Sequence, residues 1–125
     1  MTVDTITSGG TLSLTFPTGL IGLGTFTAWT LRAVDGGFLE MVADDEPALG
    51  FIVVPVEALS AEAAAKIRAT GQIAEGEVAI AMLALHDEGV TANIAGPIVI
   101  GDGGLGRQLI IEDEALPLRF PVTLP

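Results

Sequence analysis

The residues best able to do chemistry in this sequence are carboxylates, and half of the sixteen lie in three short runs. The runs are Asp44–Glu46, Asp87–Glu88 and Glu112–Glu114. Carboxylates can bind a divalent cation, or act as acid and base when two of them share a pocket in different environments. These runs lack the regular spacing and central glycine of a calcium loop, and no pattern brings two of them together. They are either solvated turns or an acidic rim for a basic partner.

The other reactive groups do not form a recognisable catalytic or ligand motif. There is no cysteine and a single histidine, His86, which argues against a zinc site. The glycine-rich stretch Gly101–Gly106 lacks the Lys-Ser/Thr of a phosphate loop and leads into a strand, so it predicts a hairpin turn. No serine lies in a G-x-S-x-G motif. We therefore expect a binding protein and no enzyme, with no cofactor and no metal.

The net charge narrows the classes of molecule that this protein can bind. Sixteen acidic and five basic residues give a formal net charge of −11. Such a field repels phosphate backbones and anionic membranes, so we expect neither direct nucleic-acid binding nor membrane binding. No signal peptide or membrane-length apolar run is present, and the lack of cysteine fits a reducing compartment, so we expect a cytoplasmic protein. The acidity either keeps an apolar domain in solution or forms a docking face for a basic partner.

Most of the chain alternates between apolar and polar residues, which predicts β-strands. A hairpin is expected at Asp35–Gly37, since glycine tolerates the backbone angles of a tight turn. Only residues 60–70 are rich in helix formers, with Ser60 as N-cap and Gly71 as the stop. We expect a single mainly β domain over residues 1–125, a small antiparallel barrel or sandwich with one short helix. The predicted strands are 11–16, 26–34, 38–43, 49–56, 77–86, 90–100, 107–113 and 116–122.

Apolar residues in a glycine-rich loop are the first candidates for partner binding. Leu20, Ile21 and Leu23 lie in such a loop, just after Pro17. They either plug one end of a barrel or form a docking patch. The lone tryptophan, Trp29, is a candidate for the core and also for an interface.

A second candidate region begins at a polar cluster on the strand predicted at 90–100. Thr91 and Asn93 can pin the start of this strand by hydrogen bonds to neighbouring backbone, which we favour, or they can contact a partner. Pro97 indicates a sheet edge or a bulge, because proline has no N–H to give to a ladder. A free edge there could accept an extended peptide of a partner.

Several motifs in this order resemble those of one known family. The "FPTGLIG" motif is followed by an acidic turn leading into a strand, then by "TANIAGPIVI", by an Arg-Gln pair and by "LRFP". In this arrangement, from about Thr11 to Val122, the chain resembles the flagellar assembly factor FliW family. It departs from the family pattern at Leu23, where an aromatic is usual, at Gly101, where an asparagine is usual, and in the alanine-rich helix.

The resemblance implies a compact antiparallel β-barrel-like fold and a regulatory role. Members of the family bind the CsrA translational repressor and also flagellin, so that secretion of flagellin frees the factor to relieve repression. The alternatives are a divergent small barrel with another protein partner, or a small enzyme or small-molecule binder. The residues that we single out for partner binding are Leu20, Ile21, Leu23, Asp44, Asp45, Glu46, Thr91, Asn93 and Pro97.

Overall fold

The computed structural model describes residues 10–34, 38–87, 89–113 and 116–122. Four strands, β1 (Thr11–Thr15), β2 (Ala28–Ala33), β3 (Leu39–Ala43) and β4 (Glu46–Pro55), form an antiparallel meander. In β1 and β3 every second residue is buried, as the alternation in the sequence predicts. The hairpin turn predicted at Asp35–Gly37 lies outside the described residues, and β2 and β3 on either side of it are paired.

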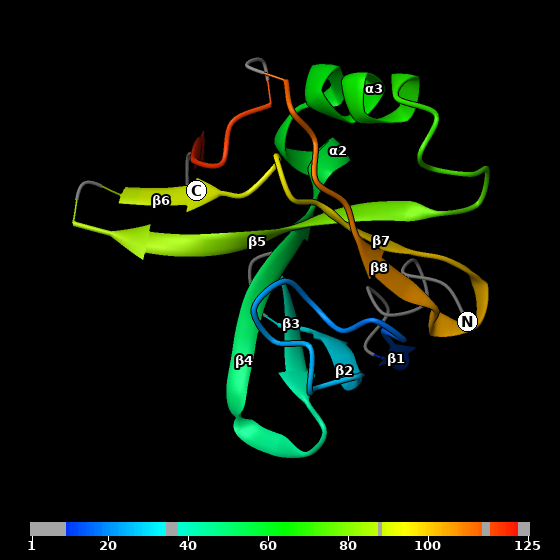
Figure 1. Cartoon of the computed structure of the whole chain (residues 1–125). Coiled ribbons are helices and arrows are strands. Elements are labelled where there is room, and N and C mark those ends of the chain that lie inside the picture. Colours follow the sequence, from blue (N-terminus) through cyan, green and yellow to red (C-terminus); the bar gives the residue numbers. More distant parts are fainter. Residues whose placement is uncertain (1–9, 35–37, 88, 114–115, 123–125) are drawn as a thin grey trace.

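The second half of the chain continues the same sheet around β5 (Val78–His86). One end of β5 pairs with β7 (Ile98–Ile100), and its other end pairs with β6 (Gly89–Ala92). β7 pairs with β8 (Gly106–Gln108), and β6 pairs with the last strand, β9 (Phe120–Val122). Figure 1 shows β6 and β7 following opposite ends of β5.

The sheet curls into a nearly closed antiparallel barrel, which confirms the predicted fold class. Leu105, just before β8, forms a parallel bridge with Thr15 of β1 and so brings the two ends of the curled sheet together. The preceding turn, η2 (Asp102–Gly104), lies against β1, and Gly104 has a φ of 79°. A Cβ on Gly104 would overlap the Ser13 carbonyl, so the glycine-rich stretch is a hairpin turn that also permits closure.

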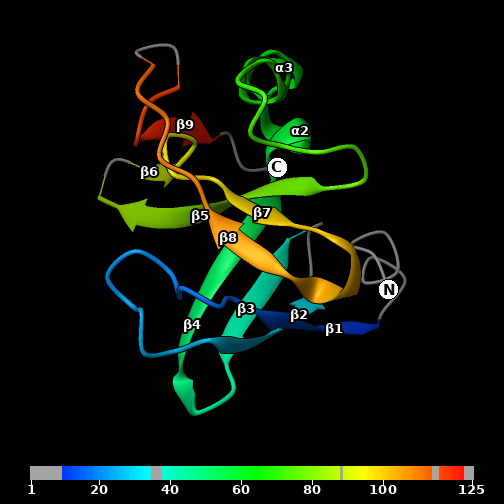
Figure 2. The ribbon, with the colours of Figure 1, turned by 45° about the vertical axis from the view of Figure 1, so that its right-hand side comes forward.

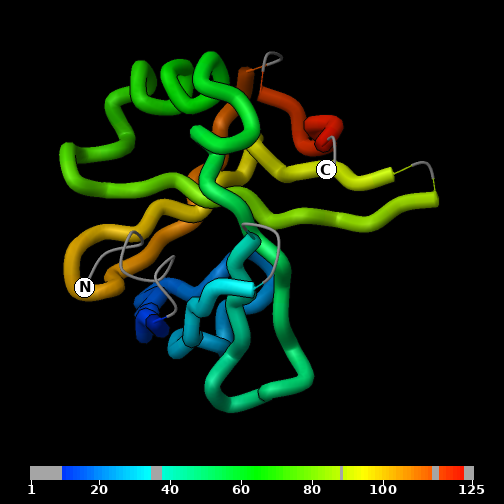
Figure 3. Tube along the Cα trace, turned by 180° about the vertical axis from the view of Figure 1, so that it is seen from behind, coloured from blue at the N-terminus to red at the C-terminus, as the bar shows by residue number. Residues whose placement is uncertain are grey.

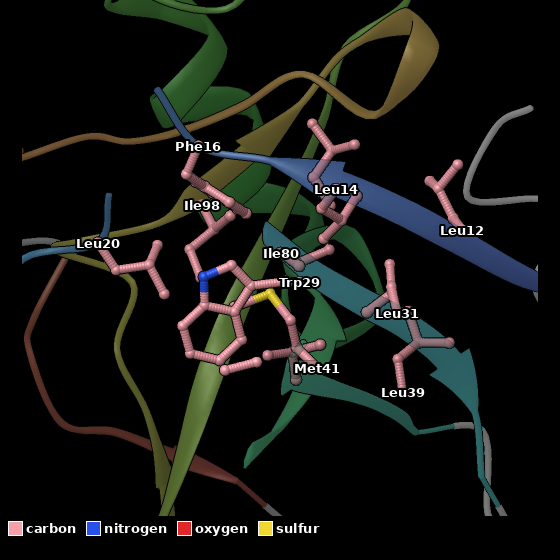
Figure 4. Close-up of a cluster of buried hydrophobic side chains, with 13 residues drawn as sticks. Leu12, Leu14, Phe16, Leu20, Trp29, Leu31, Leu39, Met41, Ile80 and Ile98 are labelled. Carbon is pink, nitrogen blue, oxygen red and sulfur yellow. The ribbon is translucent and has the colours of Figure 1, made fainter. Parts of the chain in front are cut away.

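Two apolar cores lie on opposite sides of the strands that they share. The barrel core includes Trp29, Phe16 and Ile80, and Figure 4 shows these side chains converging inside the barrel. The second core lies between the sheet and the helices, and it includes Ala81, Val99 and Ile67. Because neighbouring residues of a strand point to opposite faces, β5 and β7 supply both cores. This explains the continuous apolar run that the sequence shows at β7.

Two helices, rather than the single one expected, cover the second core. The predicted helix is confirmed as α3 (Ala61–Ala69), where Ser60 Oγ accepts a hydrogen bond from Ala63 N at 3.1 Å. The unexpected one is α2 (Val56–Leu59), a single turn directly after Pro55. Val56 ends an apolar run that predicts a strand, so the sequence pattern does not indicate this turn of helix. Figure 2 shows both helices on the same side of β5.

Three predicted strands are much shorter than expected, and the last of them, predicted at 116–122, is confined to β9 (Phe120–Val122). The strand expected at 90–100 is interrupted, since Ala92 pairs with Leu83 and Ile98 with Ile80, which leaves residues 93–97 opposite only Ala81 and Met82. This segment is a bulge. The strand expected at 107–113 ends at Gln108, because from Leu109 on the chain follows the bulge, with Leu109 N bonding to the Pro97 carbonyl at 2.9 Å.

Candidate functional site

An apolar groove lies between the loop that follows β1, the bulge at residues 93–97 and the segments on either side of residues 114–115. It consists of two adjoining hollows of about 410 and 330 Å³. Both hollows are lined by Phe51 of β4, Met82 of β5, Asn93 of the bulge and Leu118. We call the two hollows together the central groove.

The rim of the central groove exposes large apolar side chains. Ile21 is 60% exposed, Ile110 is 69% exposed and Leu118 is 63% exposed. All three line the larger hollow, although they come from distant parts of the chain. A cluster of this kind on the surface of a soluble domain is typical of a protein-binding site. The central groove therefore has the character of a docking surface.

One glutamine, Gln108, ties the two walls of the central groove together. Its Oε1 accepts a hydrogen bond from Ile21 N at 2.9 Å, and its Nε2 donates to the Gly96 carbonyl at 2.9 Å. Asn93 Oδ1 in turn accepts from Gly96 N at 2.8 Å. These bonds fix the loop and the bulge relative to each other, so the groove is largely preformed.

Thr91 and Asn93, the polar residues at the start of the strand predicted at 90–100, both make structural hydrogen bonds and both line the central groove. Thr91 Oγ1 lies 2.8 Å from His86 Nε2 across the β5–β6 pair. Asn93 closes the bulge through Gly96, as described above. Each side chain lies in the wall of the smaller hollow. The structure thus gives them a positioning role and leaves them next to any molecule bound in the groove.

The glycine-rich loop divides its apolar residues between the core and the surface. Leu20 is buried in the barrel core, whereas Ile21 is exposed and Leu23 is half-buried on the wall of the central groove. Gly19 has a φ of 70°, and a Cβ there would overlap the backbone of Gly24, so the loop folds tightly on itself. The loop therefore supplies Leu20 to the barrel core and Ile21 and Leu23 to the wall of the central groove, and a docking role for these residues stays a prediction.

The acidic turn Asp44–Glu46 lies apart from the central groove, where β3 meets β4. Thr30 Oγ1 donates to Asp44 Oδ1 at 2.7 Å, and Ala48 N donates to Glu46 Oε1 at 3.2 Å. All three acidic residues are exposed. They form an acidic projection at the end of the barrel remote from the helices, visible at the bottom of Figure 1.

Pro97 does not lie at a free sheet edge, so the expected peptide-binding edge at this position is wrong. It is buried at the end of the bulge, and its carbonyl accepts a hydrogen bond from Leu109 N. The neighbouring strand β7 has β5 on one side and β8 on the other. The structure instead contains a bulge, which was the alternative prediction for Pro97.

An ion pair between Arg107 of β8 and Glu77 fixes the chain segment that connects α3 to β5. Arg107 Nη1 lies 2.5 Å from Glu77 Oε2, and Arg107 also donates to the Gln72 carbonyl. The hydrogen bond from Arg107, followed by one from the Ala74 backbone, lowers the pKa of Glu77 to about 2. The same pair raises the pKa of Arg107. Arg107 thus holds the connection from α3 to β5, next to the residue that organises the central groove.

Side chains that could ligate a metal ion are scattered in the described part of the chain. Within that part, no three histidine or carboxylate side chains are placed to hold a metal ion. None of its helices is long and apolar enough to cross a membrane.

Sequence reasoning missed most of the walls of the central groove. The sequence pattern predicts strands at Phe51, Met82 and Gln108 without indicating a functional role, and it places Ile110 in a regular strand. The sequence did contain one indication of the groove wall at Ile110. It is adjacent to Ile111, and an alternating strand cannot bury both side chains on one face. Ile111 is buried in the second core and Ile110 is exposed.

The curled antiparallel sheet defines a small β-barrel protein. The family model described as FliW protein matches residues 2–122, so the chain belongs to the FliW family. Among solved structures, the crystal structure of the flagellar assembly factor FliW is similar, with a TM-score of 0.73 at 20% identity. The match covers 87% of this chain and 84% of that chain. No curated protein matches the sequence.

Proposed function

We propose that this protein is a cytoplasmic partner-switching regulator that binds flagellin and antagonises a CsrA-type translational repressor. In this proposal, flagellin occupies the protein until it is secreted. The freed protein then binds the repressor and relieves repression of flagellin synthesis. No chemical reaction is involved. Membership of the FliW family is the basis of this proposal.

The central groove is the observation that supports a protein partner best. A subunit held before assembly has apolar surface that its own assembly will later bury, and such surface needs an apolar counterpart. Ile21, Ile110 and Leu118 provide one on a wall that is fixed by Gln108. We therefore assign flagellin to the central groove.

The acidic turn suits the second partner. A repressor that binds RNA presents basic surface for phosphates, so a protein with a net charge of −11 is attracted to it. Asp44, Asp45 and Glu46 form an exposed acidic projection away from the central groove. Such a position is compatible with docking beside the RNA site, which would make the antagonism allosteric, and also with direct competition.

Co-purification with both candidate partners tests the proposal. The untagged chain, flagellin and the repressor from the same source are mixed pairwise and run on gel filtration, and each pair is titrated by calorimetry. We expect each pair to form a complex, and flagellin to displace the repressor. If neither partner binds, the proposed function is wrong and the protein is a divergent barrel with another partner.

The salt dependence of the association rate tests the electrostatic part separately. If the acidic turn attracts the repressor, the rate constant falls steeply as salt rises, because surface charges are screened within about 8 Å at physiological salt. Neutralising the turn with Asp45→Asn and Glu46→Gln should reduce that dependence, and Glu112→Gln is a matched control on another acidic run. An association rate that does not change with salt would contradict the role of the turn.

A further inference from the structure

β4 and β5 are paired only where they cross. Their register joins Val53, Val54 and Pro55 to Met82, Ala81 and Ile80, and no further residues of the two strands. Beyond the crossing the strands diverge, as Figure 3 shows from behind. Residues 46–52 of β4 and residues 83–86 of β5 thus form the two arms of an open angle, which we call the notch.

Each arm of the notch is paired along one edge only. The lower part of β4 pairs with β3, and the outer part of β5 pairs with β6. Within the described residues, no strand pairs with the edges that face into the notch. Such edges present backbone N–H and C=O groups that can pair with an added strand.

Apolar hollows lie against the notch on both faces of the sheet. On the outer face, a hollow of about 330 Å³ is lined by Ile52, Leu83, Leu85 and Val90, with Leu85 84% exposed. On the other face lies the smaller hollow of the central groove. The two hollows share Phe51, Leu83 and Ala84 as lining residues, so they meet at the notch.

We propose that the notch accepts an extended apolar segment of a protein partner, which adds to the sheet between β4 and β5 as an extra strand. Successive side chains of a strand point to opposite faces. An inserted segment therefore places alternate residues in the outer hollow and in the central groove, while its backbone pairs with the free edges. This inference deepens the proposed function. It rests on that function only in requiring that the partner is a protein.

Charge complementarity identifies the chemistry of the segment. The arm on β4 begins at the acidic turn Asp44–Glu46, and the arm on β5 ends at Asp87, which is also exposed. Both outer ends of the notch are thus acidic, whereas the hollows along it are apolar. The segment that fits is a short run of apolar and β-branched residues flanked by lysine or arginine.

A synthetic peptide tests this inference without any natural partner. The peptide Lys-Lys-Val-Thr-Val-Ile-Val-Thr-Lys-Lys is titrated against the full chain, and amide hydrogen exchange is followed residue by residue. We expect slower exchange at Gly50, Ile52, Leu83 and Leu85. A counterpart with glutamate in place of the four lysines should bind at least about tenfold more weakly. Unchanged exchange at these amides under saturating peptide would overturn the inference.

Surface variants show whether the notch itself is responsible. Leu85→Lys and Ile52→Lys place a charge on the outer hollow and should each weaken peptide binding at least about tenfold. The matched control is Leu105→Lys, since Leu105 is also exposed but lies at the β1–β8 closure. Equal effects in all three variants would contradict a site in the notch.

The same exchange measurement on complexes with whole flagellin and with the repressor separates this inference from the proposed function. Protection at the notch with either partner supports both proposals. Binding without protection at the notch, together with no protection by the peptide, overturns the strand insertion and leaves the proposed function standing. Protection by the peptide with neither whole protein binding overturns the proposed function alone.

Discussion

The barrel core and the central groove are made of the same kinds of side chain, but only the barrel core is closed. In the core, Trp29 is fully buried, its Nε1 donates to the Phe26 carbonyl at 2.9 Å, and its ring lies 5.9 Å from that of Phe51. In the groove, Ile21, Ile110 and Leu118 remain more than half exposed. Phe51 is common to both, since it packs against the core and lines the groove.

This difference separates residues that stabilise the fold from residues that are available to a partner. Burial of a large apolar side chain contributes about 1.5–3 kcal/mol, and the core residues already have that contribution. The exposed residues of the groove can gain it only when another molecule covers them. Substitutions in the barrel core should therefore lower stability. Substitutions of the exposed groove residues should weaken partner binding and leave stability almost unchanged.

The largest loss of stability is expected in the barrel core. Trp29→Ala removes a buried aromatic ring and leaves a cavity, so we expect the free energy of unfolding to fall by about 3–5 kcal/mol. Urea unfolding followed by far-UV circular dichroism measures this change. Ile110→Ala in the groove is the matched control, for which we expect a change of at most about 0.5 kcal/mol. Equal losses would remove the distinction between core and groove.

A smaller loss of stability is expected when the ion pair between Arg107 and Glu77, next to the central groove, is removed. Glu77→Gln removes the charge that Arg107 stabilises, and we expect a loss of about 1–2 kcal/mol at neutral pH, allowing for solvent screening of this pair. Because the folded pKa of Glu77 is lowered to about 2, its contribution is complete above about pH 4.5 and is lost as the pH falls toward 2.

Unfolding curves between pH 7 and pH 2 test this assignment. The difference in stability between the native chain and Glu77→Gln should shrink as the pH falls. Glu62→Gln is the control, since Glu62 pairs with Lys66 at 3.5 Å on an exposed face of α3. A difference at Glu77 that stays constant down to pH 2 would mean that its charge is not the source of the effect.

A loss of stability of the same size as at Glu77, with an additional effect on the central groove, is expected at Gln108. Gln108→Ala removes both hydrogen bonds that join the loop to the bulge, at a cost of about 1–2 kcal/mol. Gln108→Glu keeps an oxygen for Ile21 N and loses the donor to Gly96, so it should be intermediate. Amide exchange at Ile21 reports the released loop. Slow exchange at Ile21 in Gln108→Ala would show that the loop does not depend on this residue.

The sequence predicted the barrel better than the groove, and the reason is physical. Strands such as β1 and helix α3 are specified by local alternation and capping, so their positions could be read from neighbouring residues. The groove is assembled from Ile21, Phe51, Met82, Ile110 and Leu118, which only the folded sheet brings together.

The errors in the strand predictions have a related cause. Apolar residues on both faces of residues 90–100 and 107–113 resembled continuous strands. The bulge at residues 93–97 depends on the hydrogen bond that Gly96 N donates to Asn93 Oδ1 and on the one that Gln108 Nε2 donates to the Gly96 carbonyl. Neither bond is visible as a pattern in the sequence. Pro97 did indicate an irregularity, although the choice between an edge and a bulge required the pairing of β7 on both sides.

The most direct test of the central groove as a docking surface is the calorimetric affinity of the double variant Ile110→Ser and Leu118→Ser for flagellin from the same source. Both side chains are exposed, so the unfolding temperature should not change, and Leu105→Ser serves as an exposed control away from the groove. We predict that the double variant binds at least about tenfold more weakly, while the control binds as the native chain does. An affinity equal to that of the native chain would contradict the central claim that this groove holds the partner.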